Sequence, residues 1–166
     1  MIVLIMGVGK SGTTVATRAL CEMGIDPLHK APPFESHVAG KANKHLRAGR
    51  IDEAEWVEMV RPLVDYPQPW CCKHTLWYLT LPLAWCLFAG QDVRTCLISR
   101  PREANIASLY KGWYKGKAER VYDERWTAYK SIKERYDVPE LHLDRQWTGD
   151  EIKAWMTEHV TGRLDD

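Results

Sequence analysis

The hydrophobic residues of this chain gather in short runs that are separated by longer mixed segments. Residues 2–6 are continuously apolar and end at Gly7, which is typical of a strand buried on both faces of a parallel sheet. Similar runs predict strands at 70–73 and 93–98, and a short fourth strand is expected at 141–143. The pattern therefore predicts a parallel sheet.

Between these runs, hydrophobic residues recur with helical spacing. Helices are predicted over residues 15–23, 77–88, 102–114 and 118–135, after Asp52 and after Thr148. At the last two positions, Glu55 and Glu151 follow three residues later, which is the spacing of a capping box. Residues 25–50 are proline-rich with little periodicity, so we expect an irregular segment there. The charged run 117–135 is expected to form a solvated helix face.

Strands that alternate with helices predict an α/β fold of three layers (α/β/α) around a parallel sheet of about four to five strands. The 166 residues, 45% hydrophobic and 27% charged, fit a single domain over 1–166. A net charge of +1 gives no overall attraction to nucleic acid or to a membrane, so any anion site is local. The five cysteines lack metal-binding spacing and are expected to be free thiols, which predicts a cytoplasmic protein without a metal site.

The segment after the first strand has the composition of an anion-binding loop. It runs Gly9-Lys10-Ser11-Gly12-Thr13-Thr14 and leads directly into the first predicted helix. A helix N-terminus presents free backbone N–H groups and about half a positive charge, so a loop of this kind suits an anion. Lys10 adds a full positive charge, and the two threonines add hydroxyl groups.

The nucleotide-kinase version of such a loop is G-x-x-x-x-G-K-[ST]. Gly7 and Gly12 have the required separation, but Thr13 stands where that pattern has lysine, and Lys10 precedes the second glycine. A kinase of this class also holds Mg²⁺ with a carboxylate near a strand end. The second and third strands instead end in basic and hydroxyl residues, so the sequence disfavours ATP with Mg²⁺.

The order Lys-Ser-Gly-Thr-Thr after a strand resembles the 5′-phosphosulfate loop of the sulfotransferase family. The resemblance implies a P-loop nucleoside triphosphate hydrolase-like architecture and a loop lysine, here Lys10, that reaches the oxygen bridging phosphate and sulfate. A second motif follows the third strand, where Arg100 precedes a proline and Ser108 lies eight positions later. It is similar to the family's 3′-phosphate motif, which implies that Arg100 and Ser108 hold the ribose 3′-phosphate.

Sulfuryl transfer requires a base that removes the proton of the acceptor. Glu35 follows the first helix at a place where carbohydrate-type sulfotransferases carry a glutamate base, and His74 ends the second strand near the position of the family's histidine base. Each side chain has an equally plain structural alternative, so the choice between them stays open. Lys73 is expected to place positive charge beside the transferring group.

The resemblance predicts an enzyme that transfers the sulfuryl group of 3′-phosphoadenosine 5′-phosphosulfate (PAPS) to a hydroxyl or amine of a small-molecule or saccharide acceptor. Adenosine 3′,5′-bisphosphate (PAP) would be the product, with no metal, nucleic acid or membrane involved. Two alternatives remain open: an ATP- and Mg²⁺-dependent P-loop kinase of a small metabolite, and an inactive PAPS- or PAP-binding module. The sequence leaves the acceptor and the oligomeric state undefined.

Overall fold

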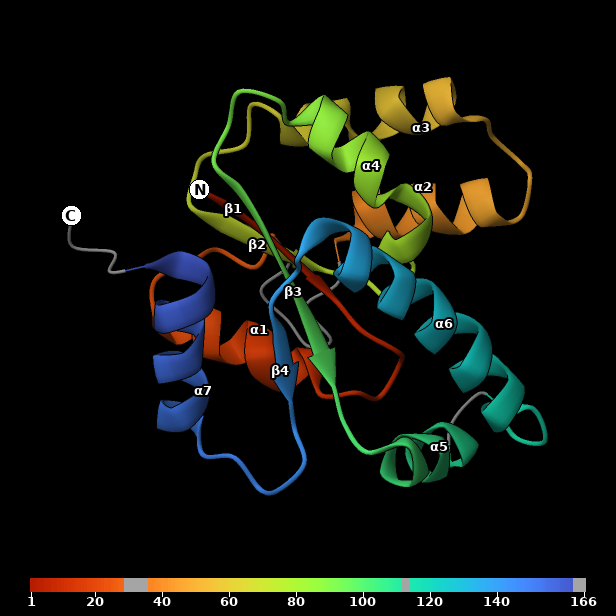
Figure 1. Ribbon diagram of the computed structural model, residues 1–166. Coiled ribbons are helices and arrows are strands. Elements are labelled where there is room, and N and C mark those ends of the chain that lie inside the picture. The colour runs from red at the N-terminus through yellow and green to blue at the C-terminus, as the bar shows by residue number, and fades with distance from the viewer. Residues whose placement is uncertain (29–35, 112–113, 163–166) are drawn as a thin grey trace.

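A parallel sheet of four strands forms the central layer of the protein (Figure 1). The computed structural model describes residues 1–28, 36–111 and 114–162. The strands are β1 (Ile2–Met6), β2 (Trp70–Lys73), β3 (Val93–Ser99) and β4 (Glu140–His142), in the spatial order β2-β1-β3-β4. β1 pairs with β2 from Ile2 opposite Trp70 to Ile5 opposite Lys73, and with β3 from Ile2 opposite Val93 to Met6 opposite Leu97. The predicted strands and the predicted α/β architecture are confirmed.

Helices cover both faces of the sheet, as Figure 1 shows. One face carries α1 (Thr13–Glu22) and α7 (Gly149–Met156), and the other carries α2 (His37–Arg47), α3 (Glu53–Val60), α4 (Trp77–Leu87) and α6 (Ala118–Tyr136). The short helix α5 (Arg102–Tyr110) follows β3 and packs against α6. A 3₁₀ turn, η1 (Arg61–Leu63), ends α3, and a π turn, η2 (Thr157–Thr161), ends α7.

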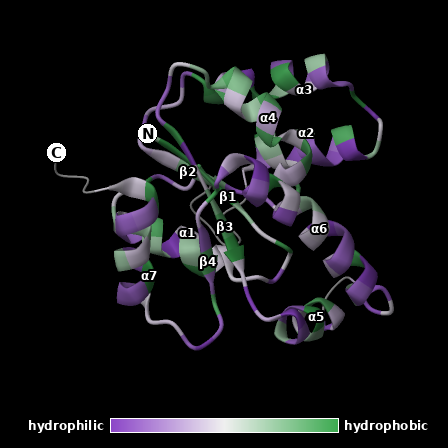
Figure 2. Cartoon of the chain, viewed as in Figure 1, coloured by the Kyte–Doolittle hydropathy of each residue, from purple (hydrophilic) through white to green (hydrophobic). Residues whose placement is uncertain are grey.

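The alternation of side chains along β1 divides the core into two parts. Ile2, Leu4 and Met6 pack with the larger group of helices, whereas Val3 and Ile5 pack with α1 and α7. All five side chains are fully buried, and burial of each contributes about 1.5–3 kcal/mol to stability. Figure 2 shows the complementary pattern on α6 and α7, where hydrophilic segments alternate with pale or hydrophobic ones.

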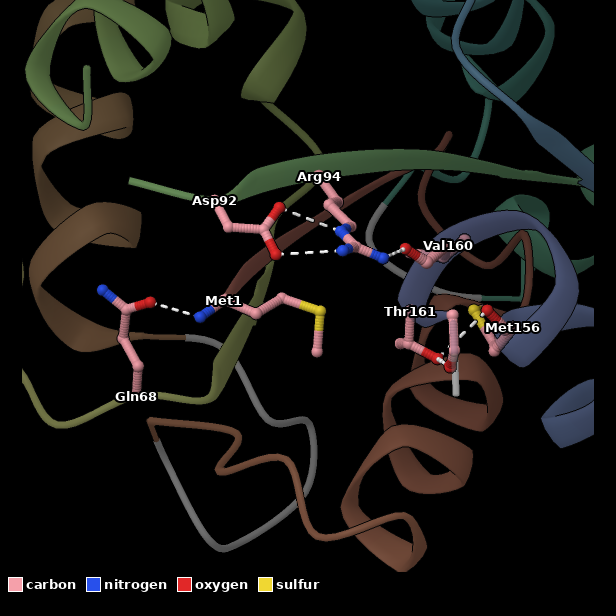
Figure 3. Close-up of polar contacts among 8 residues, drawn as sticks. Met1, Gln68, Asp92, Arg94, Met156, Val160 and Thr161 are labelled. Atoms are coloured by element: carbon pink, nitrogen blue, oxygen red, sulfur yellow. Dashed lines mark hydrogen bonds and ion pairs between the residues drawn. The ribbon is translucent and has the colours of Figure 1, made fainter. Parts of the chain in front are cut away.

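The amino ends of the strands are held by contacts that involve the end of the α7 segment (Figure 3). Arg94 donates hydrogen bonds from Nε and Nη2 to the Asp92 carboxylate at 2.9 and 3.0 Å, and from Nη1 to the Val160 carbonyl at 2.7 Å. The amino group of Met1 donates to the Gln68 side chain nearby. These structural contacts lie at the edge of the sheet opposite the glycine loop, which leaves the carboxyl edge for the site.

The predicted irregular segment 25–50 is wrong in part, because it contains α2. This helix buries Ala39, Gly40, Ala42 and Asn43, so it lacks the stripe of large hydrophobic residues by which a helix is recognised in a sequence. Both predicted capping boxes are confirmed at the starts of α3 and α7. Within the described ranges, no helix combines the length and hydrophobicity needed to cross a membrane.

Candidate functional site

The loop between β1 and α1 is a tight turn whose conformation depends on glycine. Gly12 has φ 103°, in the left-handed region, and a Cβ added there would lie 2.4 Å from Leu143 Cδ1. Lys10 also has a positive φ, 69°, which is uncommon for a residue with a side chain. No side chain of the described residues caps α1. The N–H groups of Val15 and Ala16 donate to the Gly12 carbonyl, which leaves those of Thr13 and Thr14 without a hydrogen bond in the described part of the chain.

A cavity of about 730 Å³ opens beside this loop at the carboxyl edge of the sheet. The described residues that line it are Gly9, Lys10, Gly12, Thr13 and Thr14 of the loop, Lys44, Arg47 and Ala48 of α2, Lys73, His74, Thr75 and Leu76 after β2, and Leu109, Tyr114 and Arg125. Five of them are lysine or arginine, and none of these described lining residues is a carboxylate. Their summed charge, together with the N-terminus of α1, makes the cavity suited to an anion.

Seven of the residues predicted from the sequence come together in this cavity. They are Gly9, Lys10, Gly12, Thr13, Thr14, Lys73 and His74. Ser11 of the same loop is fully buried, and its hydroxyl has no hydrogen-bond partner among the described residues. Glu35, the other candidate base, lies outside the described residues.

The predicted 3′-phosphate pair is not part of the described cavity lining. Arg100 lies beside the loop, and its Nη1 donates a hydrogen bond to the Lys10 carbonyl at 3.3 Å. It lines a small void together with Ser11 and Asn105 rather than the large cavity. Ser108 lies half-buried on α5, and neither cavity includes it among its described lining residues. Arg100 therefore contacts the backbone of the loop, and the ligand contact that the sequence motif predicts for it stays a prediction.

Arg125 is a cation of the site that the sequence did not reveal. Arg125 is only 2% exposed, and its Nη2 donates a hydrogen bond to the Tyr114 hydroxyl at 2.8 Å. The guanidinium also lies over the Tyr114 ring, 5.1 Å from its centroid. A Cβ added at Gly9 would lie 3.3 Å from Arg125 Nη1, so a side chain at this position would have to displace the guanidinium slightly.

Arg125 has no carboxylate partner among the residues that the structure describes, and its Nε is buried without a hydrogen bond. A buried charge without a partner is costly, and such groups are usually paired or bound to a ligand. A signal for it exists in the sequence, because Arg125 lies four residues from Val121 and from Tyr129, both of which are buried. The prediction of a solvated face on this helix is therefore wrong for the stripe that faces the cavity.

His74 is buried at the end of β2, with an exposed fraction of only 3%. Burial, and then the positive charges of Lys44, Lys73 and Arg125, lower the pKa of its imidazole to about 3. The ring is therefore neutral at ordinary pH.

Comparison of the sequence with protein-family models and with curated proteins gives no match. Comparison of the structure gives matches. A sugar kinase from Janibacter sp. HTCC2649, in an unliganded crystal structure, has a TM-score of 0.57 and 14% identity over 95% of this chain and 92% of that chain. The chain has a P-loop NTPase-like fold.

A deoxyadenosine kinase from M. mycoides with bound dATP also matches, with a TM-score of 0.47 and 12% identity over 95% of this chain and 98% of that chain. The 14% identity to the sugar kinase relates the two folds and not the substrates. In open α/β folds, ligands bind outside the carboxyl ends of the strands, which is where the cavity with its loop and cations lies. The fold and the cavity thus agree on the position of the site.

Proposed function

We propose that this chain is a transferase that binds the phosphate-rich end of a nucleotide donor in the cavity beside the loop and passes the donor's terminal group to a small-molecule acceptor. The observation that carries the proposal is the collection of five cations, loop backbone and the uncapped N-terminus of α1 around one cavity. Such an arrangement neutralises several negative charges at once.

The loop and its cations also suit the chemistry of group transfer. When a sulfuryl or phosphoryl group leaves, negative charge grows on the oxygen that linked it to the nucleotide. Lys10 on the loop and Lys73 at the end of β2 both line the cavity and supply charge where that oxygen would lie. Thr13 and Thr14 add hydroxyl donors, so the leaving group is stabilised by groups already in place.

Sulfuryl transfer from PAPS is the first candidate reaction. The loop order Lys10-Ser11-Gly12-Thr13-Thr14 supports it, as does a described lining that offers cations and hydroxyls but no carboxylate for Mg²⁺. In this reaction Lys10 would stabilise the leaving oxygen. Glu35 and His74 stay the two candidate bases, and the 3′-phosphate would contact cations of the cavity such as Lys44 or Arg47.

Phosphoryl transfer from ATP with Mg²⁺ is the second candidate, and the likeness of the fold to a sugar kinase favours it. The absence of Arg100 and Ser108 from the described cavity lining also favours it, because a kinase needs no clamp for a ribose 3′-phosphate. The same loop would then hold the β- and γ-phosphates, and a hydroxyl of a small metabolite would be the acceptor.

Calorimetric titration separates these reactions. PAP and ATP with Mg²⁺ are each titrated into the full chain, into Lys10→Met, and into Lys130→Met, an exposed lysine of α6 that does not line the cavity. We expect one of the two nucleotides to bind the parent and Lys130→Met alike, and Lys10→Met at least 10-fold more weakly. PAP binding identifies the sulfuryl donor and ATP binding the phosphoryl donor, whereas binding of neither nucleotide contradicts the proposal.

A further inference from the structure

A buried polar network contacts His74, and it joins α2 to α3, to α4 and to the segment after β2. Asn43 of α2 is fully buried, and its side chain contacts Trp56 of α3, Thr80 of α4 and His74 after β2. Every polar atom of the Asn43 side chain is used in this network. Its geometry fixes which nitrogen of the His74 ring carries the proton.

The orientation of the Asn43 amide follows from its donors. Trp56 Nε1 lies 2.7 Å from Asn43 Oδ1, and an indole N–H can only donate, so the atom that faces it must be the oxygen. The Thr80 hydroxyl donates to the same oxygen at 2.9 Å. The amide NH₂ group is therefore the one that faces His74, with its nitrogen 3.1 Å from His74 Nδ1.

A second donor meets the same ring nitrogen. The backbone N–H of Leu76 donates to His74 Nδ1 at 3.2 Å. Because the Asn43 amide and the Leu76 N–H both donate, Nδ1 must hold its lone pair toward them. A neutral imidazole carries one proton, which then lies on Nε2. Lys44 of α2, Lys73 of β2 and Arg125 of α6 face the ring with positive charge and oppose a second proton.

We infer that His74 serves as a neutral hydrogen-bond donor, through Nε2–H, to the anion that occupies the cavity, and that Asn43 is the residue that positions it for this role. His74 is one of the residues that line the cavity, and Nε2 is the ring nitrogen that Asn43 and Leu76 do not occupy. Gly40 of α2 lies beside Nε2, where an added Cβ would lie 3.4 Å from it. A base needs a free lone pair toward the acceptor, but the lone pair of His74 is turned inward. The identity of the anion rests on the proposed function, whereas the protonation of the ring does not.

Nuclear magnetic resonance of the full ¹⁵N-labelled chain tests the ring directly, because protonated and unprotonated ring nitrogens have very different ¹⁵N shifts. The signals of His74 are those missing from His74→Gln. We expect an unprotonated Nδ1 and a protonated Nε2 that persist from pH 8 to pH 5. A proton on Nδ1, or titration of the ring near its ordinary pKa of about 6.5, would overturn the inference.

Two variants separate the role of Asn43 from simple packing. Asn43→Asp keeps the size of the side chain but replaces the NH₂ donor by an acceptor, so His74 should place a proton on Nδ1 and its pKa should rise. Thr80→Val removes one donor to Oδ1 and leaves the His74 contact in place, so the ring should keep its parent state. A ring that is unchanged in folded Asn43→Asp contradicts the role of Asn43. If Asn43→Asp fails to fold, the parent spectrum still decides the tautomer.

The donor role is read from the Nε2 proton when pyrophosphate is added. We expect the Nε2–H resonance to move on saturation in the parent, and Lys10→Met to require a higher pyrophosphate concentration. If pyrophosphate binds without moving this resonance, the donor role is wrong while the proposed function stands. If pyrophosphate does not bind at all, the donor role fails, the titration of PAP and of ATP with Mg²⁺ decides the proposed function, and the assignment of the tautomer is unaffected.

Discussion

Replacement of Arg125 by methionine should make the empty protein more stable and anion binding weaker. Methionine matches the apolar stem of arginine on α6, but it ends before the guanidinium group and brings no charge. Arg125 is buried without a carboxylate partner among the described residues, and its Nε makes no hydrogen bond. The side chain therefore carries a desolvation cost that nothing in the described part of the protein fully offsets.

The magnitude follows from three terms. The desolvation of a buried guanidinium costs several kcal/mol. The hydrogen bond to Tyr114 offsets about 1 kcal/mol of it, and the contact with the Tyr114 ring offsets about 1 kcal/mol more. Arg125→Met should thus raise the free energy of unfolding by about 1–2 kcal/mol, which for a chain of this length is a rise in Tm of roughly 2–8 °C.

The loss in binding is worked from the same contact. A hydrogen bond between a guanidinium and an anion contributes about 1.5–3 kcal/mol, so the affinity for pyrophosphate should fall roughly 10- to 100-fold. Thermal unfolding with and without pyrophosphate measures both effects, because a ligand that binds only the folded state stabilises it by RT ln(1 + [L]/Kd) and so raises Tm less when Kd is larger. Lys130→Met, an exposed substitution on the same helix, is the control and should change neither quantity.

Both the uncompensated burial of Arg125 and its contact with the anion are ruled out if Arg125→Met is less stable than the parent and keeps the full stabilisation by pyrophosphate. That result would make Arg125 a structural residue whose contact with Tyr114 outweighs its burial. A variant that is less stable and binds more weakly would show that the desolvation cost is overestimated, while the binding role stands.

Three further predictions concern the loop and two ionisable groups. Gly12→Ala should lower the free energy of unfolding in urea by about 2–3 kcal/mol and weaken pyrophosphate binding, because its Cβ strains the backbone and collides with Leu143. The control Gly24→Ala has the same backbone strain but open space around its Cβ, so it should lower this free energy by about 1 kcal/mol and leave binding unchanged. Burial lowers the pKa of His74 to about 3, so below pH 6.5 the imidazole takes up a proton in the unfolded chain but not in the folded chain. The free energy of unfolding should therefore fall by up to about 1.4 kcal/mol per pH unit as the pH is lowered, and urea unfolding between pH 6.5 and 4.5 should show a shallower fall for His74→Gln. Burial opposes ionisation of Glu140, but hydrogen bonds from Lys133 and Ser99 lower the pKa of its carboxyl group below the usual value. The contribution of the ionised carboxylate to stability is therefore present above about pH 4.3 and is lost as the pH falls further. Glu140→Gln should lose less stability than the parent between pH 4.5 and pH 3, and an equal loss would contradict this.

The sheet and the loop could be predicted from the sequence because their signals are local. A strand buried on both faces must be continuously apolar, as residues 2–6 are. A glycine-rich loop between such a strand and a helix is typical of an anion-binding site. Helix α2 gave no such signal. It buries Ala39, Gly40, Ala42 and Asn43, and it brings Lys44 and Arg47 to the cavity, so the missed helix hid two of the five cations.

The remaining parts of the site depend on contacts between distant residues. Asn43 and His74 are 31 residues apart, and no local pattern tells that one fixes the protonation of the other. Arg125 lies in a highly charged helix, where a cation is by default expected in solvent, although its spacing from Val121 and Tyr129 would have placed it on the buried stripe. Arg100 is the converse case, since it has the spacing of the motif and contacts the Lys10 carbonyl, but it is not among the described residues that line the cavity.

The nucleotide site is tested by titration of PAP and of ATP with Mg²⁺ into the parent and into Lys10→Met. We expect one of these nucleotides to bind the parent with a stoichiometry of one, and Lys10→Met to bind it at least 10-fold more weakly at unchanged stability. Binding of neither nucleotide, or equal binding by the parent and Lys10→Met, would contradict the assignment of the loop and its cavity as the nucleotide site.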